Sequence, residues 1–113
     1  MFPIPLPEQV ELTYSSDVLE HIEPDLLVTT IQDLCNRTTR YQYHLIACHP
    51  AKKALSDGRN AHLIIEKPEW WKSKLDNLQG WNIIHEETTE RYAVVKKGPP
   101  RHVIKYIVIM EKV

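Results

Sequence analysis

The order of the expected secondary-structure elements is the feature that most restricts the fold of this chain. Strand-like and helix-like segments alternate through most of its length, and two strand-like segments then follow each other. Alternating strands and helices favour a parallel sheet with right-handed crossovers. The last two strands are separated by the turn Gly98-Pro99-Pro100, and so short a connection joins antiparallel neighbours. The sequence therefore predicts an α/β domain whose parallel sheet ends in an antiparallel strand.

Local patterns place these elements along the chain. A short helical turn is expected within residues 17–21, with Ser16 or Asp17 as its cap, and a helix follows from Pro24 to between Arg37 and Arg40. A second helix is expected to start at Lys67-Pro68 and to run through Leu75 and Leu78 to a glycine cap at Gly80. The expected strands are 10–14, 41–48, 81–86 and 103–110, and residues 91–95 either extend the third strand after a kink or form a separate one.

The size and charge of the chain exclude several classes of protein. Its 113 residues suffice for one small domain, 1–113, in which the proline-rich residues 1–9 form an extended lead-in. A formal net charge of -1 gives no basic surface for nucleic acid. No apolar run approaches the roughly 20 residues of a membrane helix. The N-terminus also lacks the pattern of a signal peptide, so Cys35 and Cys48 are expected to be buried free thiols in a cytoplasmic protein.

Two segments carry a resemblance to a known family. Residues 14–22, Tyr-Ser-Ser-Asp-Val-Leu-Glu-His-Ile, resemble the Asp-x-Leu-Glu-His signature that follows the fourth strand of class I S-adenosylmethionine-dependent methyltransferases. Residues 51–62 and the following Pro68-Glu69-Trp70-Trp71 resemble a subgroup with a Leu-x-Asp-Gly-Arg-Asn-Ala-His-Leu loop before a Pro-x-x-Trp-Trp helix. With the terminal hairpin, the resemblance covers nearly the whole chain.

The resemblance implies a partial Rossmann-like sheet. The family's strands lie in the order 3-2-1-4-5-7-6, with the seventh antiparallel, and this chain matches strands 4 to 7 with two main helices. Its expected strand order is therefore 4-5-7-6. Strands 1 to 3 are missing, together with the Gly-rich loop that approaches the cofactor and the acidic residue that binds its ribose. The three glycines, at 58, 80 and 98, cannot form such a loop.

In open α/β sheets, ligands bind beyond the carboxyl ends of the strands. Ser15, Ser16 and Asp17 fall at that end of the first strand, and the resemblance implies contact with the methionine part of S-adenosylmethionine or with the substrate beside it. Helix capping is the simpler role for Ser16 or Asp17, and the two roles are compatible. One turn further on, Glu20 is a candidate substrate contact and His21 a candidate general base, although a lone histidine is more often structural.

The loop after the second strand supplies the other candidates. Its polar residues could grip an anionic or sugar-like methyl acceptor, with Arg59 suited to a carboxylate or phosphate. The alternative is a turn whose Asp57 and Asn60 satisfy their own backbone. We expect no metal site from Cys48, His49 and His62, because their spacing fits no zinc pattern. The candidate acceptor-binding residues are His49, Asp57, Arg59, Asn60 and His62.

The missing half has physical consequences. Residues 10–14 would form an open sheet edge, and one face of the sheet would carry apolar side chains into water. A separately encoded first half or self-association, most simply a dimer, could cover these surfaces. Two functions follow: a methyltransferase part that supplies the acceptor side of the site and needs a first-half partner, or a non-catalytic remnant that acts as a homo-oligomeric module. Whether the chain alone is an enzyme stays open.

Overall fold

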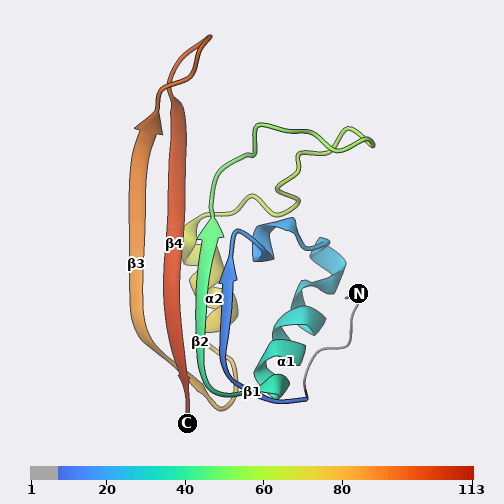
Figure 1. The fold of residues 1–113 in the computed structure, drawn as a ribbon, viewed down its shortest axis with the longest axis vertical. Helices are drawn as coiled ribbons and strands as arrows, with labels where there is room; N and C mark the ends of the chain where they lie inside the picture. The colour runs from blue at the N-terminus through green and yellow to red at the C-terminus, as the bar shows by residue number, and fades with distance from the viewer. Residues whose placement is uncertain (1–7) are drawn as a thin grey trace.

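The computed structural model describes residues 8–113, so most of the expected lead-in segment lies outside the described residues. The elements follow in the order β1 (Val10–Ser16), η1 (Leu19–His21), η2 (Pro24–Leu26), α1 (Leu27–Arg37), β2 (Thr38–Ala47), α2 (Pro68–Leu75), β3 (Trp81–Ala93) and β4 (Arg101–Lys112). Figure 1 shows one sheet, with a long β3–β4 hairpin that projects past the other strands. None of the helices in residues 8–113 combines the length and apolar character needed to cross a bilayer.

The sheet has the predicted topology. Its strand order is β1-β2-β4-β3; β1 and β2 are parallel, while β4 runs antiparallel to both β2 and β3. This order corresponds to 4-5-7-6 in the methyltransferase numbering, so the predicted α/β fold class is confirmed. Gly98, in the hairpin turn, has a φ of 93°, which a glycine adopts without strain.

Several element boundaries differ from those expected. Helix α2 ends at Leu75, before Leu78, and Asp76 rather than Gly80 is its C-cap. Gly80 instead bends the chain, with a φ of 86°, one residue before β3. Strand β2 begins at Thr38, directly after α1 with no intervening loop. Thr38 has an extended backbone, and both its amide and its hydroxyl (2.6 Å) donate to the Leu34 carbonyl in the last turn of the helix. Residues 91–93 extend β3, as one of the two alternatives predicted, and the irregularity in its pairing lies earlier, between Ile83 and His85.

Both helices cover the same face of the sheet. Ile46 and Tyr106 are paired across β2 and β4, and both belong to the hydrophobic core together with Ile31 of α1 and Trp71 of α2. Trp71 is fully buried, and the Trp70 ring packs edge-on against it, with the ring centroids 5.1 Å apart. The free thiols Cys35 and Cys48 are also buried, as predicted.

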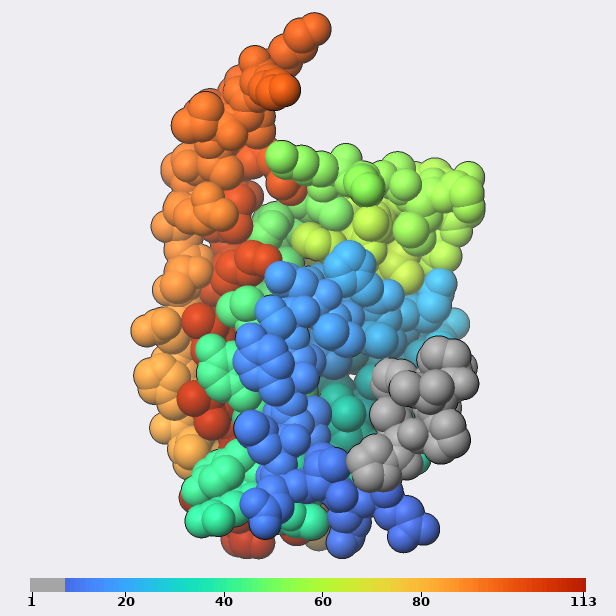
Figure 2. Space-filling model, in the orientation of Figure 1, coloured from blue at the N-terminus to red at the C-terminus, as the bar shows by residue number. Residues whose placement is uncertain are grey.

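The other face of the sheet and its β1 edge carry exposed apolar side chains. Among residues 8–113, β1 pairs only with β2, so its outer edge is open. Leu12 and Tyr14 are 57% and 63% exposed, and the Tyr14 ring stacks on its cross-strand neighbour Tyr43 at 5.1 Å. Among the described residues the expected open edge is therefore present, and in Figure 2 the residues of β1 lie at the surface. The expected exposure of the face is limited to β1, because Tyr43, Leu45, Ile107 and Ile109 on the same face are half-buried.

A buried histidine lies at the centre of the covered face. His44 of β2 is 1% exposed; its Nδ1 lies 2.6 Å from the Ser15 hydroxyl and its Nε2 lies 2.9 Å from the Gln42 side-chain oxygen. Because Gln42 Oε1 can only accept, Nε2–H is the donor and Nδ1 accepts from Ser15. Burial lowers the pKa of His44 to about 4, because the imidazolium would lose its hydration.

This burial predicts an acid-sensitive fold. The unfolded chain protonates His44 near its ordinary pKa of roughly 6.5, whereas the folded chain keeps it neutral down to about 4. The stability associated with His44 is therefore fully present above pH 6.5 and is lost as the pH falls to 4, by about 3 kcal/mol. Urea unfolding at pH 7.5 and 4.5 should show this loss in the wild type and a smaller one in His44→Gln. The exposed His85→Gln is the matched control, and an equal loss in His44→Gln and the control would contradict the assignment.

Candidate functional site

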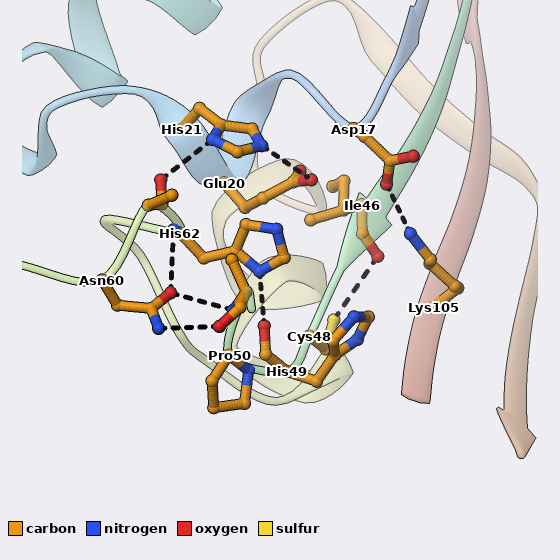
Figure 3. A network of polar contacts seen from close by, with 12 residues as sticks. Asp17, Glu20, His21, Ile46, Cys48, His49, Pro50, Asn60, His62 and Lys105 are labelled. Atoms are coloured by element: carbon orange, nitrogen blue, oxygen red, sulfur yellow. Dashed lines mark hydrogen bonds and ion pairs between the residues drawn. The ribbon is translucent and has the colours of Figure 1, made fainter. Parts of the chain in front are cut away.

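The carboxyl ends of the two parallel strands define the candidate site. Ser16 at the end of β1 pairs with Leu45 near the end of β2, so the segments that follow the two strands start side by side. One is the η1–η2 segment, and the other is the long loop of residues 48–67. Figure 3 shows polar side chains from both segments pointing toward one another.

The long loop is held against the η1–η2 segment by three contacts. The Ile64 amide donates to the Glu20 carbonyl (3.0 Å), and Nδ1 of His21 lies 2.9 Å from the Ala61 carbonyl. The Arg59 guanidinium donates to both carboxylate oxygens of Glu23, each at 2.9 Å. These contacts bring the second half of the loop over the site.

The loop also satisfies much of its own polarity. The Asn60 side-chain oxygen accepts from the amides of Ala51 and His62, both at 2.9 Å, and its amide nitrogen donates back to the Ala51 carbonyl. The Asp57 carboxylate accepts from the amide and the side chain of Arg59. Asp57 and Asn60 thus behave as the predicted self-satisfied turn, and the ion pairs of Arg59 compete with any anionic ligand.

His21, Glu20 and His62 converge beneath this loop. The rings of His21 and His62 meet edge to face at 4.8 Å, and Nε2 of His21 lies 3.8 Å from a Glu20 carboxylate oxygen. Nδ1 of His62 lies 2.5 Å from the His49 carbonyl. Because carbonyl oxygens only accept, both histidines donate from Nδ1, and each keeps an unprotonated Nε2 when neutral.

Glu20 is the least satisfied polar residue of the site. Its side chain is fully buried, and neither carboxylate oxygen has a hydrogen-bond partner among the described residues. Burial raises the pKa of Glu20, and the nearby amides of Glu20 and Ala47 oppose the rise without reaching hydrogen-bond geometry. A buried carboxyl group in this state requires a proton, a cation or another partner.

His49 stands slightly apart from this group. Its Nδ1 lies close to the backbone of Ile104, 2.9 Å from the carbonyl and 3.1 Å from the amide, and its ring lies 5.5 Å from that of His62. Burial lowers the pKa of His49. The backbone contacts make His49 a link between the loop and β4.

The residues at the end of β1 do not form the expected helix cap. Neither Ser16 nor Asp17 caps η1; Val18 is its N-cap residue and makes no side-chain cap. Asp17 adopts a positive φ of 57°, which turns its carboxylate to Lys105 of β4, with an oxygen 2.6 Å from Nζ. The Ser15 hydroxyl is engaged by His44 on the core side. Ser16 and Asp17 therefore remain the more accessible candidates at this edge.

Three partners of the site are not predicted by the sequence. Glu23 and Lys105 form ion pairs with predicted site residues, and His44 binds the Ser15 hydroxyl. The alternating burial of β2 could have placed His44 on the inner face. No sequence signal pairs Lys105 with Asp17, because 88 residues separate them.

Comparison with known proteins addresses the fold. No protein-family model matches the chain, and no curated protein sequence matches it. Two solved structures are similar. The first comes from a study of the conversion of a disulfide bond into a thioacetal group during echinomycin biosynthesis. It has a TM-score of 0.54 and 12% identity, and the match covers 93% of this chain and 49% of that one. TehB from Haemophilus influenzae has a TM-score of 0.59 and 14% identity over 96% of this chain and 37% of that one.

The chain has part of the Rossmann-like α/β fold of these two structures. Nearly all of it superposes on the two structures, yet it spans less than half the length of either. At such low identity the likeness shows the fold alone. Within this partial fold, the site occupies the end of the sheet where ligands bind in open α/β domains.

The Arg59 contacts predict a local rather than a global effect of mutation. Arg59→Ala removes the exposed ion pairs with Glu23 and Asp57, and exposed pairs add little to overall stability. Hydrogen exchange measured by mass spectrometry should nevertheless accelerate at the loop amides, including those of Ala61 and Ile64. Lys72→Ala, which breaks the exposed pair with Glu86 outside the loop, is the control and should leave these amides unchanged. Unchanged loop exchange in Arg59→Ala would show that the ion pairs do not hold the loop.

Proposed function

We propose that this chain is the C-terminal part of an S-adenosylmethionine-dependent methyltransferase, supplies the acceptor side of the site and needs a first half to bind the cofactor. The observation that carries the proposal is the end of the sheet at β1. Its outer edge is open, and the adjoining face exposes Leu12 and Tyr14. In the methyltransferase order, strand 1 would pair with that edge, and the helices of the first half would cover that face.

The polar residues support the acceptor side of the proposal. Ser16 and Asp17 lie at the carboxyl end of β1, where the methionine part of S-adenosylmethionine would come between the two halves. Glu20, His21 and His62 lie beyond them on the side of the long loop. His21 is 43% exposed, so its unprotonated Nε2 can orient or deprotonate an acceptor hydroxyl. Methyl transfer is an in-line displacement and depends mainly on positioning.

Calorimetric titration with S-adenosylmethionine tests the proposal. The chain alone should bind weakly or not at all, because it has no Gly-rich loop. Binding should appear after addition of a polypeptide that carries strands 1 to 3 with that loop, taken from the sequence encoded upstream of this chain. Absence of binding under both conditions would contradict the proposal and favour a non-catalytic remnant.

The open face gives a second prediction. Leu12→Lys places a charge on the exposed surface that the first half would cover, and it should weaken association with that half at least about 10-fold, since a desolvated charge costs over 1.4 kcal/mol. The control is Val28→Lys on α1, where the side chain is 65% exposed and lies outside this surface. Equal association of both variants with the first half would place the contact elsewhere.

Self-association is the second candidate, because the same exposed apolar side chains could pack against a second copy. Light scattering after size exclusion distinguishes the candidates. A dimer that persists when the first-half polypeptide is present supports the homo-oligomeric module. A dimer or monomer that converts to a one-to-one complex supports the split methyltransferase.

A further inference from the structure

Glu20, His21 and His62 have the composition of a metal site. One ligand atom from each residue lies within 4.8 Å of the ligand atoms of the other two. Two imidazoles and one carboxylate form the protein ligand set of one class of zinc centre, which leaves a fourth position for water or substrate. The three residues come from two segments, η1 and the long loop, that tertiary contacts bring together.

The outer contacts of the two histidines match those of metal ligands. Histidines that bind metals commonly donate their second ring nitrogen to a backbone carbonyl or carboxylate, which fixes the tautomer and ring orientation. His21 donates Nδ1–H to the Ala61 carbonyl and His62 donates Nδ1–H to the His49 carbonyl. The single lone pair on Nε2 of each histidine therefore remains available, and Nε2 of His21 faces the carboxylate of Glu20 (Figure 3).

The buried carboxylate of Glu20 is a second observation, independent of the ligand spacing, that points to a bound ion. Its carboxylate is fully buried and has no hydrogen-bond partner among residues 8–113, although native proteins rarely leave such groups unsatisfied. The Nε2 atoms of the neutral histidines cannot donate to it, and the nearby amides of Glu20 and Ala47 do not reach hydrogen-bond geometry. A divalent cation bound by all three residues satisfies the carboxylate and both nitrogens at once.

We propose that Glu20, His21 and His62 bind a divalent transition-metal ion of the zinc type. Imidazole ligands favour Zn²⁺ and its neighbours over Mg²⁺ and Ca²⁺, which prefer oxygen. In a tetrahedral zinc site, ligand atoms lie about 3.3 Å apart, so the three atoms must approach by up to about 1.5 Å. His21 Nε2 already lies 3.8 Å from a Glu20 carboxylate oxygen, and the half-exposed His21 ring leaves one side of the site in contact with solvent.

The metal assignment stands independently of the proposed methyltransferase function. In a complete site, however, the metal would occupy the Nε2 atom that His21 needs as a free base. A metal-bound acceptor hydroxyl loses its proton more readily, so the ion would take over the activation of the acceptor. Of Cys48, His49 and His62, the three residues weighed from the sequence as a metal site, only His62 belongs to this set.

Metal titration of the untagged, chelator-treated chain tests the proposal. Zn²⁺ should bind with one ion per chain by elemental analysis, and Co²⁺ should give the visible absorption of a tetrahedral site. Glu20→Gln, His21→Gln and His62→Gln should each weaken Zn²⁺ binding more than about 100-fold, beyond the typical effect of losing an outer-shell partner. His102→Gln, which removes the histidine of the exposed pair with Glu90, is the matched control and should bind as the wild type does.

Two results would overturn the metal assignment. One is unchanged Zn²⁺ affinity in His21→Gln, whose exposed side chain can be replaced without disturbing the core. The other is a loss of Zn²⁺ affinity in His102→Gln as large as that in His21→Gln, which would place the bound ion at the exposed surface. Thermal unfolding with and without Zn²⁺ adds a readout independent of spectroscopy: saturating metal should raise the midpoint of the wild type and not that of His21→Gln. None of these measurements requires S-adenosylmethionine, so their failure leaves the cofactor titration to be judged separately.

Discussion

The pairing of β2 with its two neighbours is the constraint on which the rest of the structure depends. β2 runs parallel to β1 and antiparallel to β4, so it joins the crossover part of the sheet to the hairpin. One face of β2 buries His44 and Ile46 under the helices, whereas Tyr43 lies on the other face. A shift of one residue would exchange the faces and expose the buried imidazole. The register of β2 thus fixes both the core and the point from which the long loop departs.

The distribution of helices makes this sheet incomplete in a specific way. α1 and α2 both pack on one face, and their core residues leave that face well covered. The opposite face and the β1 edge have no covering element among residues 8–113, and Leu12 and Tyr14 are exposed there. In a complete methyltransferase domain these two surfaces belong to the contact between halves. The proposed function therefore depends on elements outside this chain that would pair with the β1 edge and cover the adjoining face.

The candidate site owes its geometry to contacts between loops. Backbone carbonyls of the long loop fix the tautomers of His21 and His62, while Glu20 is buried where the η1 segment meets the sheet. The Arg59 pair with Glu23 holds the two segments together at the exposed rim. The proposed acceptor role and the proposed metal site depend on the same Nε2 atom of His21, so a bound ion would replace the histidine as the group that activates the acceptor.

The sequence by itself determined the order of the elements and the mixed sheet, whereas several element boundaries lie elsewhere than expected. Periodicity, Pro24 and the Gly98-Pro99-Pro100 turn act locally, and the antiparallel last strand follows from the short turn. The end of α2 was placed too late, because Gly80 has the character of a cap whether or not the helix reaches it. Only the tertiary structure decided that Glu20 is buried without a partner and that His62 meets His21. Contacts such as that between His21 and Ala61 join residues 40 positions apart in the sequence, and no local pattern specifies such a contact.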